Sequence, residues 1–122
     1  MPDNLSSAVS YAGITPVIVI IGGGFSGTLT AIRLLDGATE PLAIKVIEAR
    51  VDLGRGLAYS ARDPAHLTNG PAKVFSLYPD RPDHFARYLA RYGRDWGWRD
   101  PQSPDHANAH TPRWVYGDYV RA

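Results

Sequence analysis

The chain contains no cysteine among its 122 residues, which excludes a disulfide framework, a thiolate metal site and a cysteine nucleophile. It also lacks a long apolar run: residues 17–21 form the longest, far short of the ~20 residues that a membrane-spanning helix needs. The formal net charge is only +1 and the basic residues are dispersed, which argues against a nucleic-acid partner. Residues 1–15 have neither the basic nor the apolar segment of a signal peptide. We therefore expect a disordered lead-in over residues 1–15, no membrane partner and a cytoplasmic protein.

Glycine, by contrast, is present where one motif needs it. Residues 17–21 are an apolar, β-branched run of the kind found in parallel strands that are buried on both faces. Residues 22–27 read Gly-Gly-Gly-Phe-Ser-Gly, residues 28–37 have apolar side chains at helical spacing, and residues 42–47 form a second apolar segment that ends on Glu48. A dinucleotide-binding βαβ unit has this same order: a strand, a glycine turn, a helix, a second strand and an acidic residue. The sequence therefore predicts an α/β fold with a Rossmann-like βαβ FAD/NAD(P)-binding unit.

Each glycine of the turn has a separate physical role. Gly22 permits the backbone angles of a tight turn, Gly24 leaves room for a pyrophosphate, and Gly27 lets the helix lie close to the sheet. The N–H groups of the first helical turn and the helix dipole then favour the phosphate charge. The alternative is that these glycines only make a tight turn. The predicted cofactor-binding residues of this segment are Gly22, Gly23, Gly24, Phe25, Ser26 and Gly27.

Glu48 follows Gly27 by 21 residues, close to the usual spacing of the ribose-binding acid. A carboxylate there accepts hydrogen bonds from both hydroxyl groups of an adenosine ribose. It repels a 2′-phosphate, which argues against NADP in this site. Spacing alone leaves FAD and NAD as alternatives.

The second half of the chain shows no further βαβ periodicity, and seven of the ten prolines and six of the twelve glycines lie after residue 50. A Rossmann sheet has about five or six strands, so we expect the unit to be incomplete. Either the chain is a fragment of a longer protein or other chains complete it. We predict one short strand at residues 74–77, a helix at residues 82–92 and the start of another within residues 111–119. Gly37 is placed as the C-cap of the first helix.

Side chains that could carry chemistry are few in this half. The Gly54–Gly56 loop could bring Arg55 to a ligand phosphate or ring, although a surface turn with a solvated arginine is at least as good an interpretation. His84, Arg87 and Arg91 lie off the apolar stripe of the 82–92 helix and are interpreted as solvated. The four histidines show no metal-ligand spacing, so no metal site is predicted. No residue is assigned as a nucleophile, general acid or general base.

Five blocks in residues 16–120 resemble, in the same order, the FAD/NAD(P)-binding proteins related to flavin-dependent N-hydroxylating monooxygenases. They are Ile-Gly-Gly-Gly-Phe-Ser-Gly-Thr at 21–28, Gly-Arg-Gly-Leu-Ala-Tyr-Ser at 54–60, His-Leu-Thr-Asn-Gly-Pro-Ala at 66–72, Pro-Asp-His-Phe at 82–85 and Pro-Arg with Tyr-Gly and Tyr at 112–119. The resemblance implies an FAD site with Gly22, Gly24 and Gly27 at the pyrophosphate and Glu48 at the ribose.

The same resemblance implies further roles in the second half of the chain. Arg55 and Asn69 would lie along the flavin side of the cofactor. Gly70 departs from the family pattern, which has an apolar residue there, and is expected to loosen its loop. A nicotinamide nucleotide would donate electrons from a second Rossmann unit that this sequence lacks. Because such proteins have several hundred residues, residues 16–122 would be the N-terminal part of an FAD/NAD(P)-binding domain.

We therefore expect the N-terminal portion of an FAD-dependent oxidoreductase that binds the ADP moiety of FAD. NAD(P)H would be the electron donor of the full-length protein, and the substrate would be a small molecule that the sequence does not identify. The 122-residue chain by itself is expected to be inactive and marginally folded. The alternative from another class is a non-catalytic or truncated nucleotide-binding module.

Overall fold

The computed structural model describes residues 13–93 and 106–122. Along the chain, the elements are β1 (Val17–Ile21), α1 (Phe25–Gly37), β2 (Ala43–Ile47), the 3-10 helix η1 (Ala72–Val74), α2 (His84–Tyr92) and α3 (Arg113–Arg121). The predicted α/β fold with a partial Rossmann-like βαβ unit is confirmed. The expected lead-in over residues 1–15 falls mainly outside the described residues.

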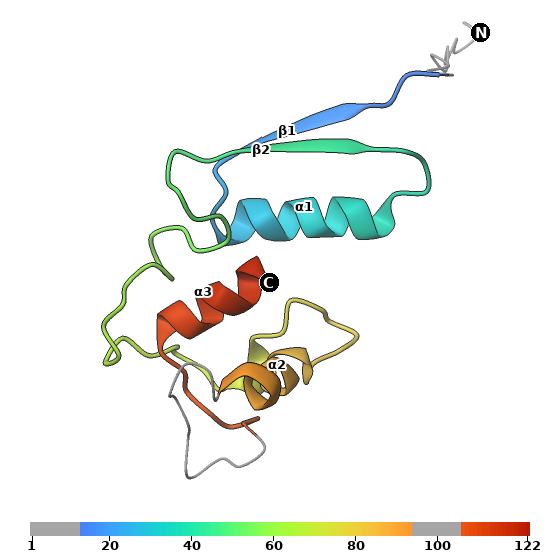
Figure 1. The fold of residues 1–122 in the computed structure, drawn as a ribbon. Coiled ribbons are helices and arrows are strands. Elements are labelled where there is room, and N and C mark those ends of the chain that lie inside the picture. The colour runs from blue at the N-terminus through green and yellow to red at the C-terminus, as the bar shows by residue number, and fades with distance from the viewer. Residues whose placement is uncertain (1–12, 94–105) are drawn as a thin grey trace, which may run out of the picture.

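The two strands form a parallel sheet that α1 covers on one side (Figure 1). Their register pairs Val17 with Ala43 and Ile21 with Ile47, so both strands end at the same edge. Ile20 faces α1, because a Cβ placed on Gly27 would lie 3.2 Å from its side chain. Parallel strands need a crossover connection, and α1 supplies it.

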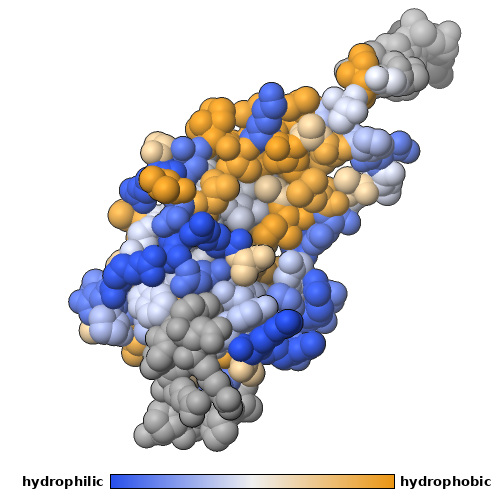
Figure 2. Space-filling model, viewed as in Figure 1, coloured by the Kyte–Doolittle hydropathy of each residue, from blue (hydrophilic) through white to orange (hydrophobic). Residues whose placement is uncertain are grey.

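The other face of this sheet is exposed, although the β-branched run predicts a strand buried on both faces. Val17 and Val19 are each 53% exposed and Ile21 is 85% exposed. Figure 2 shows apolar side chains gathered over this end of the molecule. The reason is architectural: among residues 13–93 and 106–122, only α1 packs against the sheet, so burial alternates along β1.

The buried core lies between α2 and α3. Phe85 and Leu89 of α2 meet Val115 and Tyr116 of α3, and all four side chains are at most 2% exposed. The Phe85 and Tyr116 rings pack edge to face with centroids 5.1 Å apart, a favoured aromatic geometry. Helix α1 joins this core through residues at helical spacing, namely Phe25, Leu29 and Ile32. The two later helices predicted from the sequence are confirmed, at residues 84–92 and 113–121.

The prediction of a short strand at residues 74–77 is wrong. The chain instead turns at η1, where the N–H groups of Val74 and Phe75 donate to the carbonyls of Pro71 and Ala72 at 3.0 and 3.1 Å. The preceding N–H of Ala72 donates to the carbonyl of Ala109. The bonds of Val74 and Phe75 are those of a turn, and they replace the ladder that a strand would need.

Two expectations about glycines also differ from the structure. Helix α1 continues through Gly37, and its C-cap is Ala38, whose N–H donates to the Leu35 carbonyl. A Cβ on Gly70 would lie 3.0 Å from both Phe75 and Val74. Gly70 therefore allows close packing against these side chains rather than loosening its loop.

Candidate functional site

The glycine turn lies at the carboxyl edge of the sheet, between β1 and α1. Gly22 has a φ of +98°, a conformation that side chains other than glycine rarely adopt. Its N–H donates to the Ile47 carbonyl at 2.8 Å, which ties the turn to the end of β2. The turn is therefore fixed to both strands at the edge where open α/β sheets bind their ligands.

Gly27 is the point at which α1 approaches the turn most closely. A Cβ at this position would lie 1.9 Å from the carbonyl oxygen of Gly22 and 3.1 Å from its carbonyl carbon. No side chain fits at such distances unless the backbone moves. Gly27 thus sets how near the helix begins to the end of β1, in agreement with the role assigned to it from the sequence.

Gly24 brings a second loop into the site. A Cβ on Gly24 would lie 3.3 Å from the Cα of Gly56. A Cβ on Gly56 would likewise lie 3.3 Å from the Cα of Gly24. The N–H of Gly54 donates to the carbonyl of Gly23 at 2.6 Å. The Gly54–Gly56 loop therefore lies directly against the glycine turn, although the two segments are about thirty residues apart.

A cavity of about 340 Å³ lies between these two loops and the start of α1. The N-cap of α1 is Gly24, and within the described residues no side-chain cap bond is made to the first-turn N–H groups. Backbone donors and the positive end of the helix dipole thus border a cavity that glycines keep open. The residues that line it are Ile21, Gly22, Gly24, Phe25, Ser26, Gly27, Arg55, Gly56, Leu57, Ala58 and Tyr59.

Glu48 directly follows β2, and its carboxylate turns back to the glycine turn. One oxygen accepts the N–H of Gly23 at 2.7 Å, and the other accepts the N–H of Arg50 at 2.9 Å. These bonds lower the pKa of Glu48, with the Arg50 amide as the largest cause and the Gly23 amide next. The side chain is therefore a carboxylate at neutral pH, positioned at the turn as the strand–acid spacing predicts.

Arg55 borders the cavity, but its charged end is directed into the protein. The side chain is 4% exposed, and its guanidinium donates to the Asp118 carboxylate and, at 3.2 Å, to the Trp114 carbonyl of α3. Its Nε lies 3.7 Å from Asp52 and has no hydrogen-bond partner in the described residues. Arg55 thus fastens the Gly54–Gly56 loop to α3, an arrangement that neither interpretation from the sequence included.

Replacing Arg55 with methionine is expected to lower the free energy of unfolding by about 2 kcal/mol, since Asp118 and the Trp114 carbonyl lose a charged donor. Urea denaturation measures the loss. Arg121→Met is the matched control, because Arg121 is 56% exposed and binds Asp52 at the surface. Equal losses in the two variants would contradict a structural role for Arg55.

The remaining residues divide between the site and the surface. Asn69 is exposed and is not among the residues that line the cavity. Tyr59, which the sequence did not single out, lines the cavity and packs against Phe25 with ring centroids 5.9 Å apart. Burial raises the pKa of Tyr59, so its hydroxyl stays protonated at neutral pH. The sequence signals for Tyr59 were its place three residues after the Gly54–Gly56 loop and within the block at residues 54–60.

Two further kinds of site are not seen in the described residues. Within residues 13–93 and 106–122, no three histidine, aspartate or glutamate side chains are grouped to hold a metal ion. In the same part of the chain, no helix has the length and apolar character that a bilayer span requires.

Comparison with known proteins gives one match. A family model described as FAD-NAD(P)-binding matches residues 19–122, which include both strands, the glycine turn and the Gly54–Gly56 loop. No curated protein and no solved structure matches the chain.

Proposed function

The chain belongs to the FAD-NAD(P)-binding family, and we propose that its glycine-turn cavity holds the ADP moiety of FAD. The observation that carries this proposal is the uncapped start of α1, which opens into a cavity bordered by Gly24 and Gly56. Dinucleotide pyrophosphates bind where backbone N–H groups and a helix dipole meet without intervening side chains.

The residues fit such a group. A Cβ on Gly24 or on Gly56 would narrow the space between the two loops, where the Cα of the facing glycine already lies 3.3 Å from that position. Amides at the start of α1 would donate to the phosphates. Among the described residues, no acidic side chain lines the cavity itself.

Glu48 would bind the adenosine ribose. Its two oxygens each accept one backbone N–H, which leaves further acceptor positions, because a carboxylate offers about four. A carboxylate held at the turn favours the 2′-hydroxyl of FAD or NAD over a 2′-phosphate. The resemblance to flavoproteins, and not the geometry of Glu48, is the reason for preferring FAD to NAD.

Bound FAD supplies reversible two-electron chemistry, and the protein's contribution is to bind and orient it. We therefore propose an FAD-dependent oxidoreductase in which NAD(P)H is the electron donor. The resemblance to proteins related to N-hydroxylating monooxygenases supports oxygen-dependent chemistry on a small-molecule substrate. Among the cavity residues only Arg55 and Tyr59 are titratable: one is held by Asp118 and the other stays protonated, so neither is assigned to proton transfer.

Identification of the retained cofactor tests this proposal. The purified protein is denatured, and the released nucleotide is identified by chromatography and mass. FAD with yellow flavin absorbance is the expected result. Release of NAD would assign the site to the other dinucleotide, and a colourless protein that binds neither would favour a non-catalytic module.

Glu48→Gln is expected to weaken FAD binding roughly ten-fold, because a neutral amide replaces a charged hydrogen-bond acceptor. Titration of apoprotein with FAD measures the change. Glu40→Gln is the control, since Glu40 is exposed between α1 and β2 and removes the same charge. Equal affinity of Glu48→Gln and wild type would count against ribose recognition by this residue.

We also expect the Glu48 carboxylate to make the stability of the fold depend on pH. Because its pKa is lowered in the folded state from the usual 4.5, Glu48 stabilises the fold above pH 4.5 and stops doing so as pH falls through the lowered value. The difference in melting temperature between wild type and Glu48→Gln should therefore shrink in that acidic range.

A further inference from the structure

A second cavity, of about 520 Å³, lies away from the glycine turn, between α1, α2, α3 and the loop that precedes α2. Its volume is in the range of small-molecule sites. The lining combines apolar and aromatic side chains with three arginines and a histidine. The residues are Ile32, Leu77, Tyr78, Arg81, His84, Arg87, Tyr88, Arg91, Tyr92, Tyr119, Val120 and Ala122.

The arginines place positive charge on this cavity. His84, Arg87 and Arg91 follow one another at helical spacing on α2, which brings them to the same side of the helix. They are the residues that the sequence pattern left as solvated charges. Within residues 13–93 and 106–122, no aspartate or glutamate is among the side chains that line the cavity.

Nearby carboxylates compensate these charges only weakly. Asp80 lies 3.9 Å from Arg81, and Asp83 lies 4.0 Å from Arg87; both distances exceed those of hydrogen-bonded ion pairs. All four side chains are at least 49% exposed, so water screens them. In residues 13–93 and 106–122, Arg91 forms no ion pair and instead lies 5.3 Å from the Tyr92 ring.

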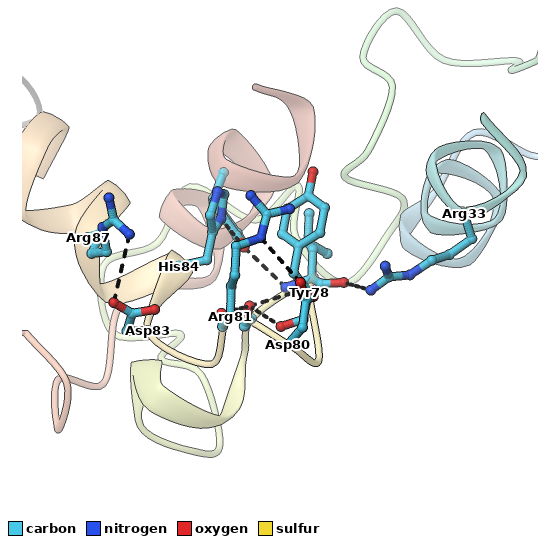
Figure 3. Close-up of polar contacts among 10 residues, drawn as sticks. Arg33, Tyr78, Asp80, Arg81, Asp83, His84 and Arg87 are labelled. Carbon is cyan, nitrogen blue, oxygen red and sulfur yellow. Dashed lines mark hydrogen bonds and ion pairs between the residues drawn. The ribbon is translucent and has the colours of Figure 1, made fainter. Parts of the chain in front are cut away.

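Aromatic contacts join the residues at the centre of the cavity lining, and Figure 3 shows Tyr78, Arg81 and His84 close together. The Arg81 guanidinium lies over the Tyr78 ring, 3.9 Å from its centroid, and the His84 ring meets Tyr78 edge to face at 4.7 Å. From α1, Arg33 reaches the same tyrosine and donates to the Leu77 carbonyl. A guanidinium stacked on a ring keeps its in-plane N–H groups for an oxyanion.

His84 gives a second sign of concentrated positive charge. Its Nδ1 is 2.9 Å from the Tyr119 hydroxyl, which orients the ring. Burial lowers the pKa of His84 first, and the charges of Arg81 and Arg87 lower it further. An anion bound beside these arginines would oppose the second effect and raise that pKa.

We propose that this cavity binds a small molecule that joins an apolar or aromatic body to a phosphate or carboxylate group. Arg81, Arg87 and Arg91 hold the anionic group, and the tyrosines with Ile32 and Leu77 contact the body. Arginine matches both oxyanions through its paired N–H donors, so the two groups share one recognition chemistry. The site is separate from the glycine-turn cavity, with which it shares no lining residue.

Calorimetric titration of the chain with phenyl phosphate, 3-phenylpropionate and benzyl alcohol tests the proposal. Phenyl phosphate or 3-phenylpropionate should bind with a dissociation constant of about 1 mM or lower, within the limits for ligands of this size, and the better of the two identifies the anionic group. Benzyl alcohol should bind more weakly than both. Binding of either anion should raise the His84 pKa measured by NMR. The Gly24→Val variant, which changes the other cavity, should bind the anion with unchanged affinity.

Variants of exposed arginines locate the bound anion. Arg87→Gln and Arg91→Gln should each weaken binding about three-fold or more, and Arg81→Gln combined with Arg87→Gln about ten-fold. Arg62→Gln is the control, because Arg62 is exposed near Trp114 and does not line the cavity. Three results would overturn the proposal: unchanged affinity in both single variants, equal binding of benzyl alcohol, or no saturable binding of either anion.

Discussion

Gly24→Val is expected to weaken FAD binding about a hundred-fold or more and to leave the purified protein without flavin. The Cβ would lie 3.3 Å from the Cα of Gly56, and the two methyl groups beyond it would enter the cavity or push the second loop away. Either outcome closes the space proposed for the pyrophosphate. Flavin absorbance per protein and titration of apoprotein with FAD measure the effect.

Gly37→Val is the matched control, since nothing lies within 4 Å of a Cβ at the end of the same helix. It should retain wild-type flavin content. A folded Gly24→Val protein with undiminished flavin would remove the pyrophosphate from this turn. Circular dichroism of both variants separates loss of binding from loss of the fold.

Gly27→Ala is expected to lower the free energy of unfolding by about 3 kcal/mol, at the upper end of overpacking effects. Its Cβ would lie 1.9 Å from the Gly22 carbonyl oxygen, a backbone atom that no side-chain rotation can move. Helix α1 must then shift away from the end of β1, which also displaces its first-turn N–H groups. Urea denaturation gives the stability, and FAD titration gives the accompanying loss of affinity.

Gly37→Ala adds the same methyl group to the same helix in open space. It should be neutral or slightly stabilising, because alanine favours helix by up to about 1 kcal/mol over glycine. If Gly27→Ala and Gly37→Ala have equal stability, the close approach of α1 to the turn is not a property of the protein.

Local sequence signals predicted the elements around the glycine turn, because the interactions that form them are local. The apolar runs, the glycines and the helical spacing that follows are contiguous, and they place β1, the turn and α1 where the structure has them. Glu48 needed one further argument: parallel strands end at the same edge, so an acid after β2 lies beside the turn. The roles of the glycines in binding remain predictions.

Contacts distant in sequence explain what the pattern did not show. Arg55 binds Asp118, which is 63 residues away, and no spacing rule indicates that pair. Residues 74–77 have the apolar character of a strand, but they begin at the last residue of η1, whose residues Ala72 and Lys73 donate to the carbonyls of Ala109 and Ala107. Arg33 of α1 lies 5.4 Å from the Tyr78 ring centroid although the two residues are far apart in the sequence, and the same ring contacts Arg81 and His84.

Backbone amide shifts on addition of FAD test the central claim most directly. ¹⁵N-labelled protein is titrated with FAD, and the amides that move are assigned. We expect the largest shifts at Gly24, Phe25, Ser26 and Gly27, with smaller shifts at Glu48 and Gly56, because the first-turn N–H groups would meet the phosphates. Saturable shifts confined to residues outside the turn, or no shifts at all, would contradict a dinucleotide site at the start of α1.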